Sequence, residues 1–132
     1  MQGVKSLMAV GLGGALGTGS RYALSLLALQ YEPGLAVLAT LAANVLGAAL
    51  IGYLATRELG TMSSALWMTG FCGGFTTFSL FSLETLMLFE RSLGLAFAYA
   101  VLSLVLWLIA VWAGYTAGQR KCARSGFPPT RP

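Results

Sequence analysis

The segment from Gly70 to Glu84 carries the groups of this chain that are best suited to binding an ion. It reads G-F-C-G-G-F-T-T-F-S-L-F-S-L-E, with paired glycines, paired threonines, hydroxyl side chains and phenylalanines. The paired residues predict that a helix breaks near 73–77. In hydrocarbon an unpaired backbone N–H or C=O is costly, so a broken helix is tolerated only where protein buries it or where it lines a polar cavity. The segment therefore indicates an ion or substrate site.

Two aromatic residues follow the expected break. Phe78 and Phe81 are three residues apart and would share one helix face. Such a pair is usually packing, but hydroxyl side chains surround this one at positions 76, 77, 79 and 82. The positive edge of an aromatic ring could receive a small anion, and carbonyls freed by the break could bind a hard cation. Packing and an anion path beside a structural cation both remain open.

Three other polar side chains interrupt apolar stretches. Asn44 follows Thr40 by one helical turn, and its amide either bonds a neighbouring helix or donates to an anion. Glu84 is a functional candidate because carboxylates inside membranes are rare and costly, although it could instead pair with a donor from a neighbouring helix. Arg21 either snorkels to an interface or supplies positive potential to a vestibule. The residues alone do not decide between these alternatives.

The composition places these groups in a membrane. Of 132 residues 57% are hydrophobic, 9% are charged and none is histidine. Since a spanning helix needs about 20 apolar residues, we expect an all-α membrane protein with transmembrane helices at 4–28, 35–57, 62–90 and 94–118. These would form one four-helix domain at 1–118, followed by a basic, flexible tail at 119–132. We do not expect an enzyme, because the sequence shows no pairing of a nucleophile with a base. We also expect no nucleic-acid partner.

Glycine spacing and charge predict how the helices associate. Glycines four residues apart allow close contact between membrane helices, and they recur at 13 and 17, 70 and 74, and 114 and 118. Four spans put both termini on one side. That side carries most basic residues, which favours cytoplasmic termini. A bundle of four helices is too thin to enclose a pore alone, so we expect an oligomer.

The chain resembles the CrcB/Fluc family of small fluoride channels up to about residue 118. The resemblance rests on the glycine-rich start that leads to Ser20-Arg21-Tyr22, on the segment 40–44, and on the segment 70–82 with Glu84. It implies a multi-pass protein of the cell (inner) membrane that exports cytoplasmic fluoride passively and so lowers fluoride toxicity. It also implies a dual-topology homodimer, in which a second copy lies antiparallel in the lipid.

The resemblance also implies roles for individual residues. A structural sodium ion, not itself transported, would be held at the break by the backbone carbonyls of Gly73 and Thr76. Arg21 matches a vestibule arginine, and Glu84 matches the acidic residue of the third helix. The fluoride path would be lined by residues from three helices, namely Asn44, Phe78, Phe81, Thr40, Thr77, Ser79, Tyr99 and Ser103.

Some features of the chain depart from this pattern or favour alternatives. Trp107, one turn after Ser103, stands where some members of the family have a small polar residue. The basic tail could favour one orientation in the membrane and so suit a paired heterodimer. Charges near the C-terminus usually affect orientation less than the first helix does, so the homodimer is preferred. The main alternative function is a small four-helix proton-coupled multidrug exporter that uses Glu84. Such exporters rely on an acid in the first helix, which this chain lacks. A membrane scaffold would not require the clustered hydroxyls.

Overall fold

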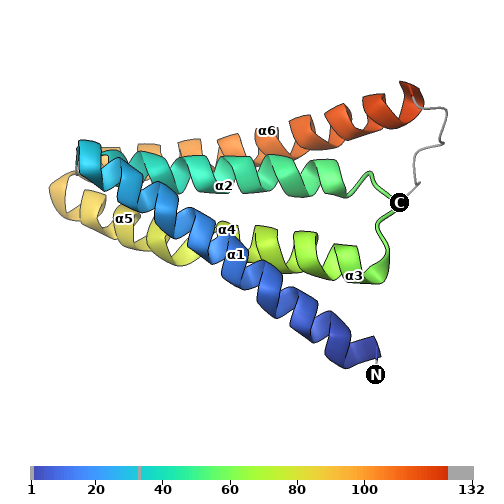
Figure 1. Ribbon diagram of the computed structural model, residues 1–132. Coiled ribbons are helices and arrows are strands. Elements are labelled where there is room, and N and C mark those ends of the chain that lie inside the picture. Colours follow the sequence, from blue (N-terminus) through green and yellow to red (C-terminus); the bar gives the residue numbers. More distant parts are fainter. Residues whose placement is uncertain (1, 33, 125–132) are drawn as a thin grey trace.

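A computed structural model describes residues 2–32 and 34–124, and within those ranges every regular element is helical (Figure 1). Two long helices come first, α1 (Gln2–Tyr31) and α2 (Leu35–Leu54). A third, broken helix consists of α3 (Thr61–Ser64), the π-helical segment η1 (Ala65–Cys72), α4 (Gly73–Phe75) and α5 (Phe78–Arg91). The chain ends in α6 (Leu93–Arg124). The all-α class and the break in the third helix are confirmed.

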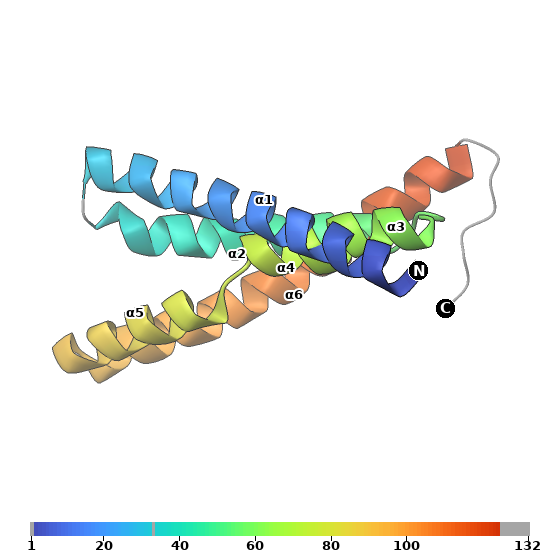
Figure 2. The same cartoon turned by 60° about the horizontal axis from the view of Figure 1, so that its bottom comes forward.

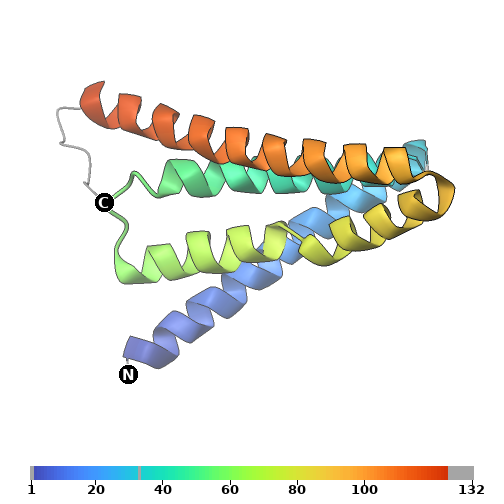
Figure 3. The same ribbon diagram turned by 180° about the vertical axis from the view of Figure 1, so that it is seen from behind.

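The helices lie side by side, with the start of α1 and the end of α6 at the same end of the bundle (Figure 1). Before the break, the third helix packs against α1, and after it α5 packs against α6 (Figure 2). The break therefore lets one helix leave the first neighbour and join another. Seen from behind, the interruption lies near the middle of the third helix, with α6 alongside α2 (Figure 3).

Three helices in the described part of the chain are long and apolar enough to cross a membrane: Leu35–Leu54, Thr61–Arg91 and Leu93–Ala123. We expected four. The difference is α1, whose 30 residues include Lys5, Arg21 and several glycines. These residues lower its hydropathy without shortening the helix.

The predicted end of the last helix at residue 118 is wrong, because α6 continues to Arg124. The extension packs on the end of α2. The thiol of Cys122 is buried and donates to the Thr56 carbonyl at 3.5 Å, and Arg57 lies 4.0 Å from the same sulfur. The predicted flexible tail at 119–132 is therefore helical over 119–124, and its remainder lies outside the described residues.

Glycines bring the helix backbones into direct contact, as their spacing predicts. A methyl group added at Gly13 of α1 would lie 2.9 Å from the Phe71 amide nitrogen and 3.0 Å from Gly70 Cα. At the α2–α6 contact, a methyl group on Gly114 would lie 2.8 Å from the carbonyl carbon of Ala49. Real side chains essentially never come so close to backbone. The glycine pairs therefore fix the spacing of the bundle.

This packing predicts different outcomes for two identical substitutions in α1. Gly13→Ala should lower the free energy of unfolding by about 1–3 kcal/mol through overpacking. Gly11→Ala is the control, since nothing lies within 4 Å of a methyl group there and both changes raise helix propensity equally. Thermal unfolding in detergent measures both. Equal stabilities for the two variants would contradict the assigned contact.

Candidate ion site at the helix break

The third helix is interrupted by two extended residues. Thr76 has φ −80° and ψ 154°, and Thr77 has φ −148° and ψ 121°. Residues in this conformation cannot continue the helical hydrogen-bond ladder. The carbonyls of residues 73–76 and the amides of residues 77–80 consequently need other partners.

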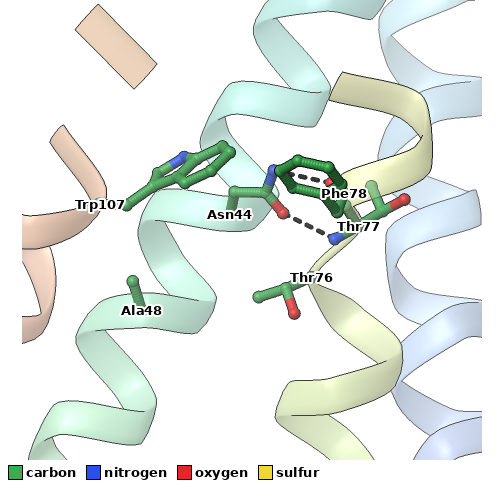
Figure 4. Close-up of a pocket in the computed structure, with 6 residues that line it drawn as sticks. All are labelled: Asn44, Ala48, Thr76, Thr77, Phe78 and Trp107. Carbon is green, nitrogen blue, oxygen red and sulfur yellow. Dashed lines mark hydrogen bonds between the residues drawn. The ribbon is translucent and has the colours of Figure 1, made fainter. Parts of the chain in front are cut away.

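The carboxamide of Asn44 on α2 bonds both backbone groups of Thr77. Its Nδ2 donates to the Thr77 carbonyl at 3.0 Å, and its Oδ1 accepts from the Thr77 amide at 2.7 Å (Figure 4). Asn44 is only 4% exposed. Of its two predicted roles, the bond to a neighbouring helix is confirmed. The amide group has two N–H donors, so its second N–H is not used by this clamp.

The break frees carbonyls at the end of α4. In a continuous helix the Thr77 amide would donate to the Gly73 carbonyl, but here it donates to Asn44. The space beside Gly73 Cα is open to at least 4 Å. The Gly74 carbonyl instead accepts from Thr18 Oγ1 at 3.3 Å and from Arg21 Nε at 3.4 Å. Arg21 therefore places its positive charge at the break itself. The predicted locations for this side chain were a membrane interface or a vestibule, and neither specified the break.

The start of α5 presents backbone amides, whereas the end of α4 presents carbonyls. Thr77 caps this helix, because its hydroxyl accepts from the Leu80 amide at 3.3 Å, and it lies 3.2 Å from the Ser79 hydroxyl. The first amides of a helix carry partial positive charge, and the last carbonyls carry partial negative charge. Both kinds of end meet at this break. Discontinuous membrane helices bind anions and cations through such ends.

The two phenylalanines share a face, as predicted, but their surroundings differ. Their ring centroids are 5.5 Å apart. Phe81 is 6% exposed and packs against Tyr99 at 5.5 Å and Trp107 at 4.9 Å. Phe78 is 69% exposed. Phe81 thus belongs to the core of the chain, whereas Phe78 lies at its surface.

Glu84 joins three helices. Its Oε1 accepts from Thr40 on α2 at 2.6 Å, and its Oε2 accepts from Tyr99 on α6 at 2.7 Å. The prediction that a neighbouring helix supplies its partner is confirmed. Ser103, one turn beyond Tyr99, is fully buried. Thr40 and Tyr99, both predicted to line a path, thus direct their hydroxyl hydrogens at a carboxylate.

A pocket of about 220 Å³ lies between α2, the break and α6. Of the predicted residues it gathers Asn44, Thr76, Thr77 and Phe78 (Figure 4). Ala48 and Trp107 complete the lining and were not predicted as site residues. The signal for Trp107 was its position one helical turn after Ser103 on the same face of α6. The other predicted path residues do not line this pocket.

The Asn44 clamp predicts a pH-dependent rescue. Asn44→Leu removes both hydrogen bonds to Thr77, and each buried group left unpaired should cost about 1–3 kcal/mol of stability. Asn44→Asp retains an acceptor, but the ionised carboxylate cannot donate. When lower pH protonates that carboxyl, it can again donate and accept. The thermal stability of Asn44→Asp should therefore rise relative to Asn44→Leu as pH falls. A constant difference between the variants would contradict the clamp.

Comparisons with known proteins identify the family. A family model described as CrcB-like protein, Camphor Resistance (CrcB), matches residues 8–115. The fluoride-specific ion channel FluC of Paracoccus denitrificans is 42% identical over 118 residues, which are 86% of this chain and 94% of that protein. FluC of Opitutus terrae is 44% identical over 116 residues, covering 82% and 88%. FluC 1 of Mycobacterium bovis is 44% identical over 113 residues, covering 81% and 85%. This chain therefore belongs to the CrcB family.

Proposed function

We propose that this protein is a fluoride-selective ion channel through which cytoplasmic fluoride leaves the cell passively. The observation that carries the proposal is the match, over most of the chain, to relatives named fluoride-specific ion channels. The protein is a multi-pass protein of the cell membrane and not an enzyme. Neutral HF that enters through lipid dissociates at cytoplasmic pH, and the channel gives the trapped anion a route out.

The chemistry of the break supports an anion path. Fluoride is small and tightly hydrated, so a pore must replace its water with hydrogen-bond donors while keeping binding weak enough for release. The break offers the unused N–H of Asn44, the first amides of α5 and the Ser79 hydroxyl. The rings of Phe78 and Phe81 follow directly, and their edges are positive. In a low-dielectric setting these partial charges are poorly screened.

The cation end of the break supports a structural sodium site. The Gly73 carbonyl lacks its helical donor, the Thr77 amide, and the Thr76 carbonyl lies at the same helix end. Carbonyl oxygens are suitable ligands for a hard cation. A sodium ion held there would add fixed positive charge beside the anion path and would not itself be transported.

The exposure of these groups supports a dimer of antiparallel copies. Gly73 is exposed, and Phe78 is 69% exposed on a single chain. A second copy packed on this face would bury the aromatic ring and add its own carbonyls to the cation site. In this arrangement α1 is the fourth span, since it packs on η1 and α4 and begins at the end of the bundle where α6 ends. The basic residues of that end would then face opposite sides of the membrane in the two copies.

The exporter alternative has less support. Both oxygens of Glu84 are already bonded by hydroxyls, whereas a coupling carboxylate must exchange its partners during transport. The pocket of about 220 Å³ is also smaller than the ~300–1,000 Å³ typical of drug-sized sites. The channel is therefore the better account of the site.

A flux assay tests the proposed function. The purified full chain would be placed in liposomes loaded with potassium fluoride or potassium chloride, and valinomycin would carry the potassium. We expect rapid fluoride efflux, followed with a fluoride electrode, while chloride leaves no faster than from empty liposomes. Fluoride efflux equal to that of empty liposomes would overturn the proposal. Proton-dependent drug movement would favour the exporter.

Removal of sodium tests the cation site separately. In the same liposomes, replacement of all sodium by N-methylglucamine should abolish most fluoride efflux, and return of sodium should restore it. Potassium fluoride with valinomycin keeps the driving force unchanged in both cases. Full efflux without sodium would rule out an essential sodium ion while leaving the fluoride channel intact.

A further inference from the structure

Two buried polar atoms in the described part of the chain have no hydrogen-bond partner. They are Ser103 Oγ and Trp107 Nε1. Both belong to α6, and their spacing of four residues puts them on one face of that helix. Buried polar groups nearly always have a partner, so an exception requires an explanation. Trp107 is the more informative of the two because it also lines the pocket at the break.

The indole of Trp107 borders the pocket and also contacts Phe81. It extends from α6 toward Asn44 and Phe78 (Figure 4), and its ring meets Phe81 at 4.9 Å with an interplanar angle of 69°. The same ring therefore contacts a core phenylalanine and borders the pocket of about 220 Å³.

The chemistry of the group restricts its ligand. Indole Nε1–H is a donor with no acceptor capacity, so it suits an anion and cannot coordinate a cation. Two nearby donors are already bonded: the Thr76 hydroxyl donates to the Cys72 carbonyl at 2.9 Å, and one N–H of Asn44 donates to the Thr77 carbonyl. Trp107 thus supplies an uncommitted donor on the α6 side of the pocket.

We infer that Trp107 is an anion-binding, specificity-determining residue of the path, whose indole N–H donates to fluoride in the pocket beside Asn44. Nε1 is covered in the present orientation, so the ring turns toward the pocket when the anion enters. This rotation is favourable because the buried indole N–H then gains a hydrogen-bond acceptor. The same turn leaves less room for a larger anion. This inference rests on the proposed fluoride channel function.

NMR of the wild-type full chain tests the inference directly. The chain has three tryptophans, at positions 67, 107 and 112, and therefore three indole N–H signals in ¹⁵N-labelled protein in detergent. Addition of sodium fluoride should move the Trp107 signal downfield, because a hydrogen bond to an anion deshields the proton. Sodium chloride at the same concentration should not. Trp67→Phe and Trp112→Phe variants assign the signals by elimination, so no folded Trp107 variant is required.

Substitution gives a second, functional measurement. Trp107→Phe keeps an aromatic ring but removes the N–H, and it should lower fluoride affinity about tenfold, as expected for one hydrogen bond to a charged group. Fluoride efflux from liposomes should fall as well. Trp112→Phe on the same helix is the control, because Trp112 is 68% exposed and should keep wild-type efflux.

The outcomes separate this inference from the proposed function. If the wild type conducts fluoride but its Trp107 signal does not respond to fluoride, the inference is wrong. An upfield Trp107 signal that fluoride leaves unchanged would show that the N–H points at the face of Phe81, which also overturns it. Wild-type efflux and selectivity in Trp107→Phe would do the same. Absence of fluoride efflux from the wild type would instead overturn the proposed function.

Discussion

The paired hydrogen bonds between the Asn44 carboxamide and the backbone of Thr77 make the broken helix possible. One side chain bonds both backbone groups of an extended residue in an environment where water cannot do so. Because these bonds fix Thr77, they also fix where the carbonyl end of α4 stops and where the amide end of α5 begins. The two polarities of the site therefore depend on a residue that belongs to another helix.

The other contacts keep Asn44 within reach of the break. The glycine contacts set the distances between α1 and η1 and between α2 and α6, while Glu84 connects α2, α5 and α6 through Thr40 and Tyr99. Membrane helices associate through close backbone packing and hydrogen bonds between helices, and this chain uses both around one segment. Both kinds of contact hold α2 beside the interrupted segment.

The sequence predicted the helices, the glycine contacts and the location of the break, because these depend on local composition and spacing. It left the partners of Asn44, Glu84 and Arg21 open, since these depend on how each helix is rotated about its axis, which weak amphipathicity does not determine. The extension of α6 was missed because a buried contact of Cys122 with Thr56 holds it. Residue types alone indicated an ion site, and only the family resemblance named fluoride.

The hydroxyls around Glu84 determine the direction of hydrogen bonding between three helices. A hydroxyl has a single hydrogen, and those of Thr40 and Tyr99 both point at the carboxylate. Toward any other neighbour these two hydroxyls therefore offer only lone pairs, so they can accept a hydrogen bond but not donate one. They can turn into donors only if the carboxylate releases them, for example by taking up a proton. The positions of the protons in this small network thus determine which hydrogen bonds connect α2, α5 and α6.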